Sequence, residues 1–194
     1  MNRLTDQELI EKIRAGNTSA YSLLVDRYKH LVYTAAVRML RNNEDAEEVS
    51  QDVFMSVYKS LPKFRGDSKV STWMYRITYN KCLDHMKRKS GRPLAGAEDI
   101  SEAFDIGAMD KNMDAMEQME RKEMVRSAIS ALPEDEALLI TMFYLDELTL
   151  KEIASVTGDS VNTVKVRLHR SRKRLMVQLK NNMEPETLKS YERG

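Results

Sequence analysis

The chain has 194 residues, of which 42 % are hydrophobic and 31 % charged, with a formal net charge of +1; this length suits one large domain or two small ones. Its single cysteine, Cys82, excludes an internal disulfide framework and a cysteine-based zinc site. No apolar run approaches membrane-spanning length and the N-terminus lacks a signal-peptide core, so we expect a cytoplasmic protein without membrane insertion of its own.

The N-terminal part of the chain shows helical spacing of its apolar residues. Four helices are predicted, over about residues 5–13, 19–40, 44–61 and 71–89. Thr5 and Glu8 have the spacing of a capping box at the first of them, and Ser71 is the expected N-cap of the fourth. Helices joined by short turns can close a bundle-like core, which predicts a helical domain over residues 1–90.

Residues 91–116 lose this periodicity and predict a flexible acidic linker. Between Leu94 and Glu120 there are eight acidic residues against one basic residue, whereas Asp159 to Lys180 holds seven basic residues against one acidic residue. The nearly neutral total therefore conceals two oppositely charged segments, and it does not argue against a nucleic-acid partner.

Helical spacing resumes near Glu117 and predicts a second helical domain over residues 117–194. Helices are expected over about 133–144, 150–157 and 161–179, with Gly158 supplying the turn between the last two. The sequence carries no strand signal. We therefore predict an all-α protein with an N-terminal four-helix domain, a flexible acidic linker and a C-terminal helix-turn-helix domain.

The last two helices have the layout of a DNA-reading helix-turn-helix. Ile153 and Ala154 are expected to face inward, and Val164 and Leu168 to seat the second helix. The outward side of that helix carries polar and cationic residues suited to base edges and phosphates: Asn162, Thr163, Lys165, Val166, His169, Arg170 and Arg172. The alternative is a basic, solvated helix in an ordinary bundle.

The segment from Phe64 to Lys89 combines aromatic and basic residues, which together suit unstacked bases and their backbone. On a helix, the consecutive Trp73, Met74 and Tyr75 fan over roughly 200°, so at least one should lie off the core face. The alternative is that all three side chains belong to the core.

The predicted third helix is acidic in its first half. Five acidic residues and no basic residue lie between Glu44 and Met55. Acids in the first turns suit the helix dipole, and they also make a docking surface for a basic protein partner. The residues alone leave both interpretations open.

Three blocks together resemble a bacterial extracytoplasmic-function (ECF) sigma factor: 46–54 (AEEVSQDVF), 64–88 (FRGDSKVSTWMYRITYNKCLDHMKR) and 132–175. They correspond to the family's polymerase-binding helix, its promoter-melting and −10-reading segment, and its −35-reading domain. The resemblance implies a non-catalytic subunit that binds core RNA polymerase, recognises −35 and −10 promoter elements and promotes DNA melting. It also implies contacts with the clamp of the largest subunit and the flap of the second, and an anti-sigma factor.

The resemblance assigns roles residue by residue. Contact with the polymerase core is implied for Glu47, Glu48, Gln51, Asp52 and Phe54. Binding and melting of the −10 element is implied for Phe64, Arg65, Ser68, Lys69, Val70, Trp73, Tyr75, Arg76, Asn80, Lys81, Lys87 and Arg88. Binding of the −35 duplex is implied for Asn162, Thr163, Lys165, Val166, Arg167, His169, Arg170, Arg172 and Arg174.

Two other classes of protein share features with this sequence. A stand-alone helix-turn-helix regulator of duplex DNA does not need the 64–89 segment, and a recombinase would need a mixed α/β domain with a nucleophile. No phosphate loop, zincin motif or catalytic triad spacing is present, so we expect no enzyme activity, catalytic residue, metal or cofactor.

For the linker, the resemblance implies passage through the polymerase's nucleic-acid channel; the alternative is a passive tether. A further hypothesis is that its acids pair with the basic helix in the free protein.

Overall fold

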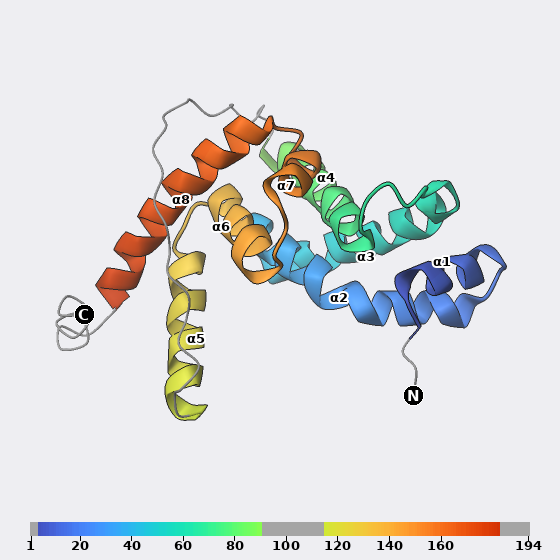
Figure 1. Cartoon of the computed structure of the whole chain (residues 1–194), viewed down its shortest axis with the longest axis horizontal. Coiled ribbons are helices and arrows are strands. Elements are labelled where there is room, and N and C mark those ends of the chain that lie inside the picture. The colour runs from blue at the N-terminus through green and yellow to red at the C-terminus, as the bar shows by residue number, and fades with distance from the viewer. Residues whose placement is uncertain (1–3, 91–114, 183–194) are drawn as a thin grey trace. The chain divides into compact units, whose positions relative to one another are not determined.

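The computed structural model describes residues 4–90 and 115–182, so residues 91–114 of the predicted linker, and the hypothesis that its acids pair with the basic helix, lie outside the described residues. The regular elements of the described part are helical (Figure 1). They are α1 (Asp6–Arg14), α2 (Thr18–Leu40), α3 (Asn43–Ser60), the short 3-10 turn Leu61–Lys63, α4 (Val70–Ser90), α5 (Ala115–Ser130), α6 (Glu134–Ile140), the π-type turn Thr141–Leu145, α7 (Leu150–Thr157) and α8 (Val161–Asn182).

The boundaries of the first helices follow local rules. The capping box predicted at α1 is confirmed: Thr5 N donates to Glu8 Oε2 at 2.6 Å, and Glu8 N donates to Thr5 Oγ1 at 3.3 Å. Asn17 caps α2 by accepting from the backbone of Ala20 at 3.0 Å. The predicted cap at Ser71 is wrong, because α4 already begins at Val70 and places Ser71 in its first turn.

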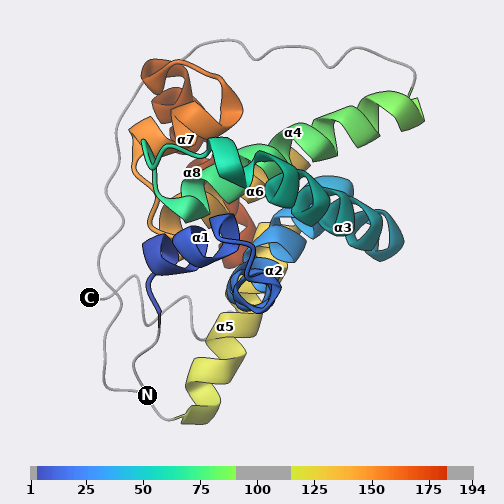
Figure 2. The same ribbon diagram turned by 90° about the vertical axis from the view of Figure 1, so that its right-hand side faces the viewer.

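The described residues form two compact units. The first contains α1 to α4 together with residues 151–158. Within it α2, α3 and α4 pack against one another, as both ribbon views show, and α1 packs on α2 (Figure 2). The core between these helices contains Leu24, Val32, Val53, Met74 and Cys82, each less than 2 % exposed. Burial of these apolar side chains is the main force that holds the helices together.

The second unit contains α5, α6 and α8, and α8 packs against both of the others. Its core includes Ile129, Leu132, Leu138, Val164 and Leu168, all buried. Glu136 is also buried, with only 2 % of its surface exposed. A buried carboxylate must be paired with charges or hydrogen bonds, so this residue bears on the electrostatics of α8.

Across residues 4–90 and 115–182, none of the helices has the length and apolar character needed to cross a membrane.

Candidate nucleic-acid interface

The outward face of α3 carries the acidic residues that the sequence singled out. Glu47, Glu48 and Gln51 are exposed, whereas Asp52 and Phe54 are half-buried. An open groove of about 440 Å³ runs beside this face, and it is lined by Lys29, His30 and Tyr33 of α2 and by Glu47, Ser50, Gln51 and Phe54 of α3. The structure therefore brings Glu47, Gln51 and Phe54 into one groove, while Glu48 and Asp52 lie outside its lining.

Two tyrosines fix the position of α3 on α2. The Tyr21 hydroxyl donates to the Phe54 carbonyl at 2.5 Å, and its ring meets the Tyr58 ring edge-on with centroids 4.9 Å apart. Burial raises the pKa of Tyr21 to about 12, so the hydroxyl remains a donor at any physiological pH. Phe54 is thus held in place at the groove by a hydrogen bond between the two helices.

The loop from 64 to 69 joins the 3-10 turn to α4. Phe64 is half-buried and lies against the Trp73 ring, with ring centroids 4.7 Å apart. Gly66 has φ +81, a conformation that side chains rarely adopt, and it turns the chain outward. The following residues up to Lys69 are exposed. The loop therefore begins on an aromatic pair and has exposed polar residues, of which Lys69 pairs with Glu152 of α7 at 3.1 Å.

One face of α4 continues from the aromatic pair. Arg76, Asn80 and Lys87 follow Trp73 at positions three, seven and fourteen along the helix, so they lie on the same face. All three are exposed, as is Arg88, while Lys81 is half-buried. A partly exposed ring followed by a row of cationic and amide side chains is suited to a single strand with stacked bases and a charged backbone.

The expectation that one of the three consecutive residues 73–75 lies off the core face is confirmed. Met74 and Tyr75 are at most 1 % exposed, and only Trp73 is partly exposed. The direct DNA contacts that the sequence suggested for Tyr75 and Val70 do not fit this structure, because both are in the core. Their positions on α4 turn them toward the neighbouring helices, where they support the surface rather than form it.

The first turn of α8 is capped by Ser160. Its hydroxyl oxygen accepts from the backbone N of Thr163 at 3.0 Å and lies 2.8 Å from the Thr163 hydroxyl. Asn162 and Lys165 are exposed on this turn and the next, and Val166 is half-buried. This cap orients the end of the helix that, in a helix-turn-helix, reads base edges.

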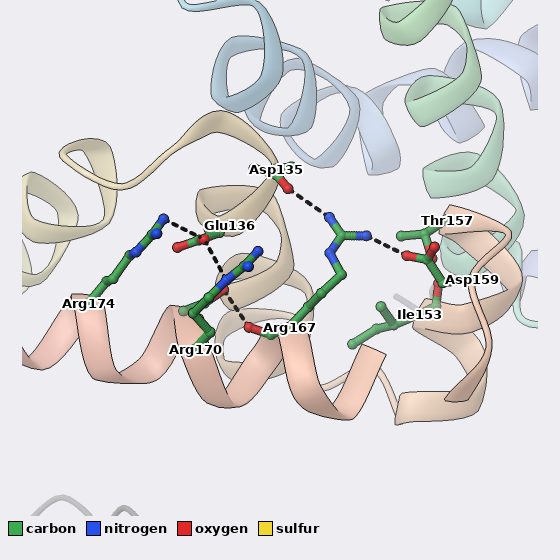
Figure 3. Close-up of polar contacts among 9 residues, drawn as sticks. Asp135, Glu136, Ile153, Thr157, Asp159, Arg167, Arg170 and Arg174 are labelled. Atoms are coloured by element: carbon green, nitrogen blue, oxygen red, sulfur yellow. Dashed lines mark hydrogen bonds and ion pairs between the residues drawn. The ribbon is translucent and has the colours of Figure 1, made fainter. Parts of the chain in front are cut away.

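Three arginines predicted to contact DNA point from α8 toward acidic residues of the same unit (Figure 3). Arg167, whose side chain is 12 % exposed, pairs with Asp135 at 2.9 Å and with Asp159. Glu136 Oε1 lies 2.7 Å from Arg174 and 3.3 Å from Arg170. The prediction that Arg167 contacts DNA does not fit this geometry, because its guanidinium is held inside the domain by two carboxylates.

Arg170 and Arg174 differ from Arg167 in exposure. Their side chains are 42 % and 50 % exposed, so each can keep its contact with Glu136 and still present part of its guanidinium to a phosphate. Arg172 lies over the Tyr144 ring, 6.0 Å from its centroid. His169 is half-buried, and its Nε2 is covered, with no hydrogen-bond partner among the described residues.

Sequence reasoning missed the acidic partners of α8. Asp135 and Glu136 lie in the first turn of α6, where acids suit the helix dipole, and their contacts with α8 add a second role. The charge pattern offered one signal, because Asp159 is the only acidic residue in the basic segment 159–180. Sequence reasoning also missed Arg14 of α1, which lies against the start of the 64–69 loop.

Comparison with known proteins places this arrangement in a family. The sigma-70 region 2 family model matches residues 24–92, and the sigma-70 region 4 model matches residues 122–175. The ECF RNA polymerase sigma-E factor of Escherichia coli K12 is 36 % identical over 176 residues, which cover 88 % of this chain and 92 % of that protein. The chain belongs to the ECF sigma factor family.

Other relatives agree with this assignment. The ECF sigma factor SigW of Bacillus subtilis 168 is 32 % identical to this ECF sigma factor over 180 residues, covering 89 % of this chain and 95 % of SigW. Among solved structures, the complex of CnrH with the cytosolic domain of CnrY matches with a TM-score of 0.62 and 24 % identity, over 92 % of this chain and 99 % of that one. The Bartonella quintana sigma factor RpoE, solved with the anti-sigma factor NepR, matches with a TM-score of 0.59 and 19 % identity, over 82 % and 96 %. These structures share the fold.

Proposed function

We propose that this ECF sigma factor binds core RNA polymerase through α3, reads a −10 element as a single strand with the 64–69 loop and α4, and reads a −35 duplex with α8. The observation that carries the proposal is the combination, within one helical unit, of an acidic α3 surface and the Phe64–Trp73 pair that opens the α4 stripe. A regulator that binds only duplex DNA has no need of either surface.

The polymerase contact is assigned to the exposed acids and amide of α3, chiefly Glu48 and Gln51, with Asp52 at their edge. The clamp of the largest subunit is the partner that the family supplies. Exposed apolar side chains on the same helix, Met55 at 54 % and Tyr58 at 51 %, add the contact area that a protein partner needs. The groove beside α3 extends this surface onto α2.

The −10 element is assigned to the 64–69 loop together with the α4 stripe. A base that leaves the duplex needs a ring or pocket to offset the cost of unstacking, and Trp73 with Phe64 is the aromatic site on this surface. Stacking stabilises each base by about 1–3 kcal/mol, which is similar to the cost of opening one or two base-pair steps. One or two captured bases therefore bias melting, and the polymerase supplies the rest.

The −35 duplex is assigned to the first turns of α8. We assign contacts with base edges and nearby phosphates to Asn162, Lys165 and Val166. Contacts with the DNA backbone are assigned to the exposed parts of Arg170 and Arg174. Arg167 is assigned to the structure of the domain instead. In the full complex we expect the same domain to meet the flap of the second-largest polymerase subunit.

An anti-sigma factor is the further partner that we propose. The RpoE structure contains the anti-sigma factor NepR bound to the sigma factor, and the CnrH structure contains the cytosolic domain of CnrY. A regulator of this kind would act by covering the α3 surface or the DNA-reading surfaces, since occupation of either prevents transcription initiation.

The decisive test is co-elution of the purified protein with bacterial core RNA polymerase. We expect the wild type to bind, and a variant with Glu48→Lys, Gln51→Lys and Asp52→Lys to lose binding by at least tenfold, because each new cation removes an acidic or amide contact with a basic partner. A matched control carries Gln7→Lys, Glu11→Lys and Asp26→Lys, three exposed positions of α1 and α2 with the same change in net charge.

The control should bind core polymerase as the wild type does. Failure of the wild type to bind would overturn the proposal and favour a stand-alone regulator of duplex DNA. Equal loss in both variants would show a nonspecific effect of charge, and would remove the assignment to α3.

A further inference from the structure

The last residue of α1 reaches across to the start of the 64–69 loop. Arg14 Nη2 donates a hydrogen bond to the Phe64 carbonyl and lies 3.5 Å from the Leu61 carbonyl. Both carbonyls lie beyond the end of α3, and the Leu61 carbonyl also accepts from the Phe64 backbone N at 3.1 Å. An arginine fork can satisfy two such acceptors at once.

The helix that carries Arg14 is itself held firmly. Arg27 of α2 pairs with Asp6 at 2.5 Å and donates to the Leu4 carbonyl at 2.5 Å, and the Tyr28 hydroxyl donates to the same Asp6 carboxylate. Leu9 and Ile10 bury the inner face of α1. The first turn of α1 is held by these contacts and its middle is buried in the core. The position of Arg14 at the end of the helix is therefore fixed relative to α2.

The loop is thus restrained at its first residue from two directions. The Phe64 ring packs on Trp73 at 4.7 Å, and its carbonyl is held by Arg14. Beyond it, Gly66 turns the chain and the side chains are exposed. A concavity of about 660 Å³ lies at this junction, and its lining contains Arg14, Pro62, Lys63, Phe64 and Arg65, with cations as its only charged side chains among the described residues.

We propose that Arg14 is a positioning residue that sets the shape of the 64–69 loop and thereby its selectivity for the captured −10 base. This inference rests on the proposed function. Arg14 lies outside the 24–92 match to region 2, so a helix beyond that match determines how the reading loop is presented. Loss of its hydrogen bonds leaves the Phe64 backbone free to move, so the loop loses discrimination between bases while the binding surfaces themselves remain.

The test uses polymerase reconstituted with the full chain and a promoter library randomised across the −10 element. The quantity measured is the ratio of open-complex formation between the best and the worst base at the most selective position. We expect R14M to lower this ratio about tenfold, since one wrongly read base is worth about 1–3 kcal/mol and 1.4 kcal/mol is a factor of ten. R14K should recover part of the ratio, because an ammonium can still donate to the Phe64 carbonyl.

The matched control is K63M, which removes a cation from the same concavity without touching a loop carbonyl. It should keep the wild-type ratio, while affinity falls for all sequences and the salt dependence weakens by about one charge. If the wild-type holoenzyme shows no base preference, the proposed function fails. If the wild type is selective and R14M stays within twofold of its ratio, the role of Arg14 is overturned and the proposed function stands.

A second measurement follows the loop without DNA. Trp73 is the single tryptophan of the chain, so acrylamide quenching of its fluorescence reports directly on the Phe64 contact. R14M should raise the quenching constant at least twofold, whereas K63M should leave it unchanged. Unchanged quenching in R14M, or a general loss of helical circular dichroism, would overturn the proposal, because the first leaves the loop in place and the second makes Arg14 a residue of general stability.

Discussion

Glu136 of α6 and Arg174 of α8, 38 residues apart in sequence, form an ion pair of 2.7 Å in which the carboxylate is 2 % exposed and the guanidinium half-exposed. The same Oε1 atom lies 3.3 Å from Arg170. The second carboxylate oxygen is buried without a hydrogen bond among the described residues. The pairing therefore offsets the cost of burying one charge, and it also restrains two of the cations that we assign to the DNA backbone.

Replacement of Glu136 should destabilise the second unit. We expect Glu136→Gln to lower the free energy of unfolding by about 1–3 kcal/mol, because Arg174 loses a charged hydrogen-bond partner and Arg170 loses an ion pair. Chemical denaturation followed by circular dichroism measures the change. The control is Glu123→Gln in α5, which removes an exposed pair with Arg126 at 3.7 Å and should cost less than about 0.5 kcal/mol. Equal effects of the two substitutions would contradict the structural role of Glu136.

Arg167 and Lys165 should respond differently to removal. Arg167→Ala breaks the contacts with Asp135 and Asp159 and should lower the free energy of unfolding by about 1–3 kcal/mol. Lys165→Ala removes an exposed side chain, so its stability should stay within about 0.5 kcal/mol of the wild type. Its affinity for −35 duplex should fall, with a salt slope smaller by about one.

Fluorescence anisotropy with labelled duplex at several salt concentrations, beside thermal denaturation, separates the two effects. If Arg167→Ala keeps the wild-type stability and its DNA affinity depends less on salt, Arg167 contacts DNA and the structural role assigned to it is wrong.

Cys82 should be inert in the native protein. It is fully buried, and burial raises the pKa of its thiol to about 12. At pH 8 only about one thiol in 10⁴ is then ionised, and the thiolate is the reactive form. We expect no reaction with Ellman's reagent in buffer over an hour and complete reaction in urea. Rapid labelling in buffer would mean that the core between α2, α3 and α4 opens easily.

Asp45 should contribute to the pH dependence of the first unit. Lys89 donates to its carboxylate at 2.6 Å and His85 lies 3.3 Å away, and chiefly the Lys89 hydrogen bond lowers the pKa of Asp45 below its ordinary value of 3.8. A lowered pKa means that the ionised carboxylate stabilises the fold above pH 3.8. This stabilisation is lost as the pH falls through the lower folded-state value.

Thermal melting of wild type and Asp45→Asn between pH 2.5 and 7 tests this. The wild type should melt at a higher temperature near neutral pH, and the two curves should converge as the pH falls below 3.8. Asp84→Asn, at an exposed position of α4, is the control and should follow the wild type throughout. A constant difference between wild type and Asp45→Asn across the whole pH range would contradict the assignment to ionised Asp45.

Much of the fold could be predicted from local pattern. The Thr5–Glu8 capping box and the turn at Gly158 depend on residues within one or two helical turns of each other, and their predicted positions agree with the structure. The α4 start was misplaced by one residue, since a serine in the first turn resembles a cap in sequence. It was harder to predict which residues of α4 are buried. The spacing shows that the side chains of residues 73–75 point in different directions, and it does not show which of these directions faces the core.

The sequence by itself determined an all-α chain, the oppositely charged segments, and three blocks whose order marks an ECF sigma factor. Helical periodicity, capping and charge are local properties, so they can be seen without coordinates. Only the tertiary structure decided that Asp135 and Asp159 hold Arg167, that Tyr75 is core, and that Arg14 meets Phe64 from 50 residues away. These outcomes depend on how each helix is rotated and packed against its neighbours, which burial of the shared core sets.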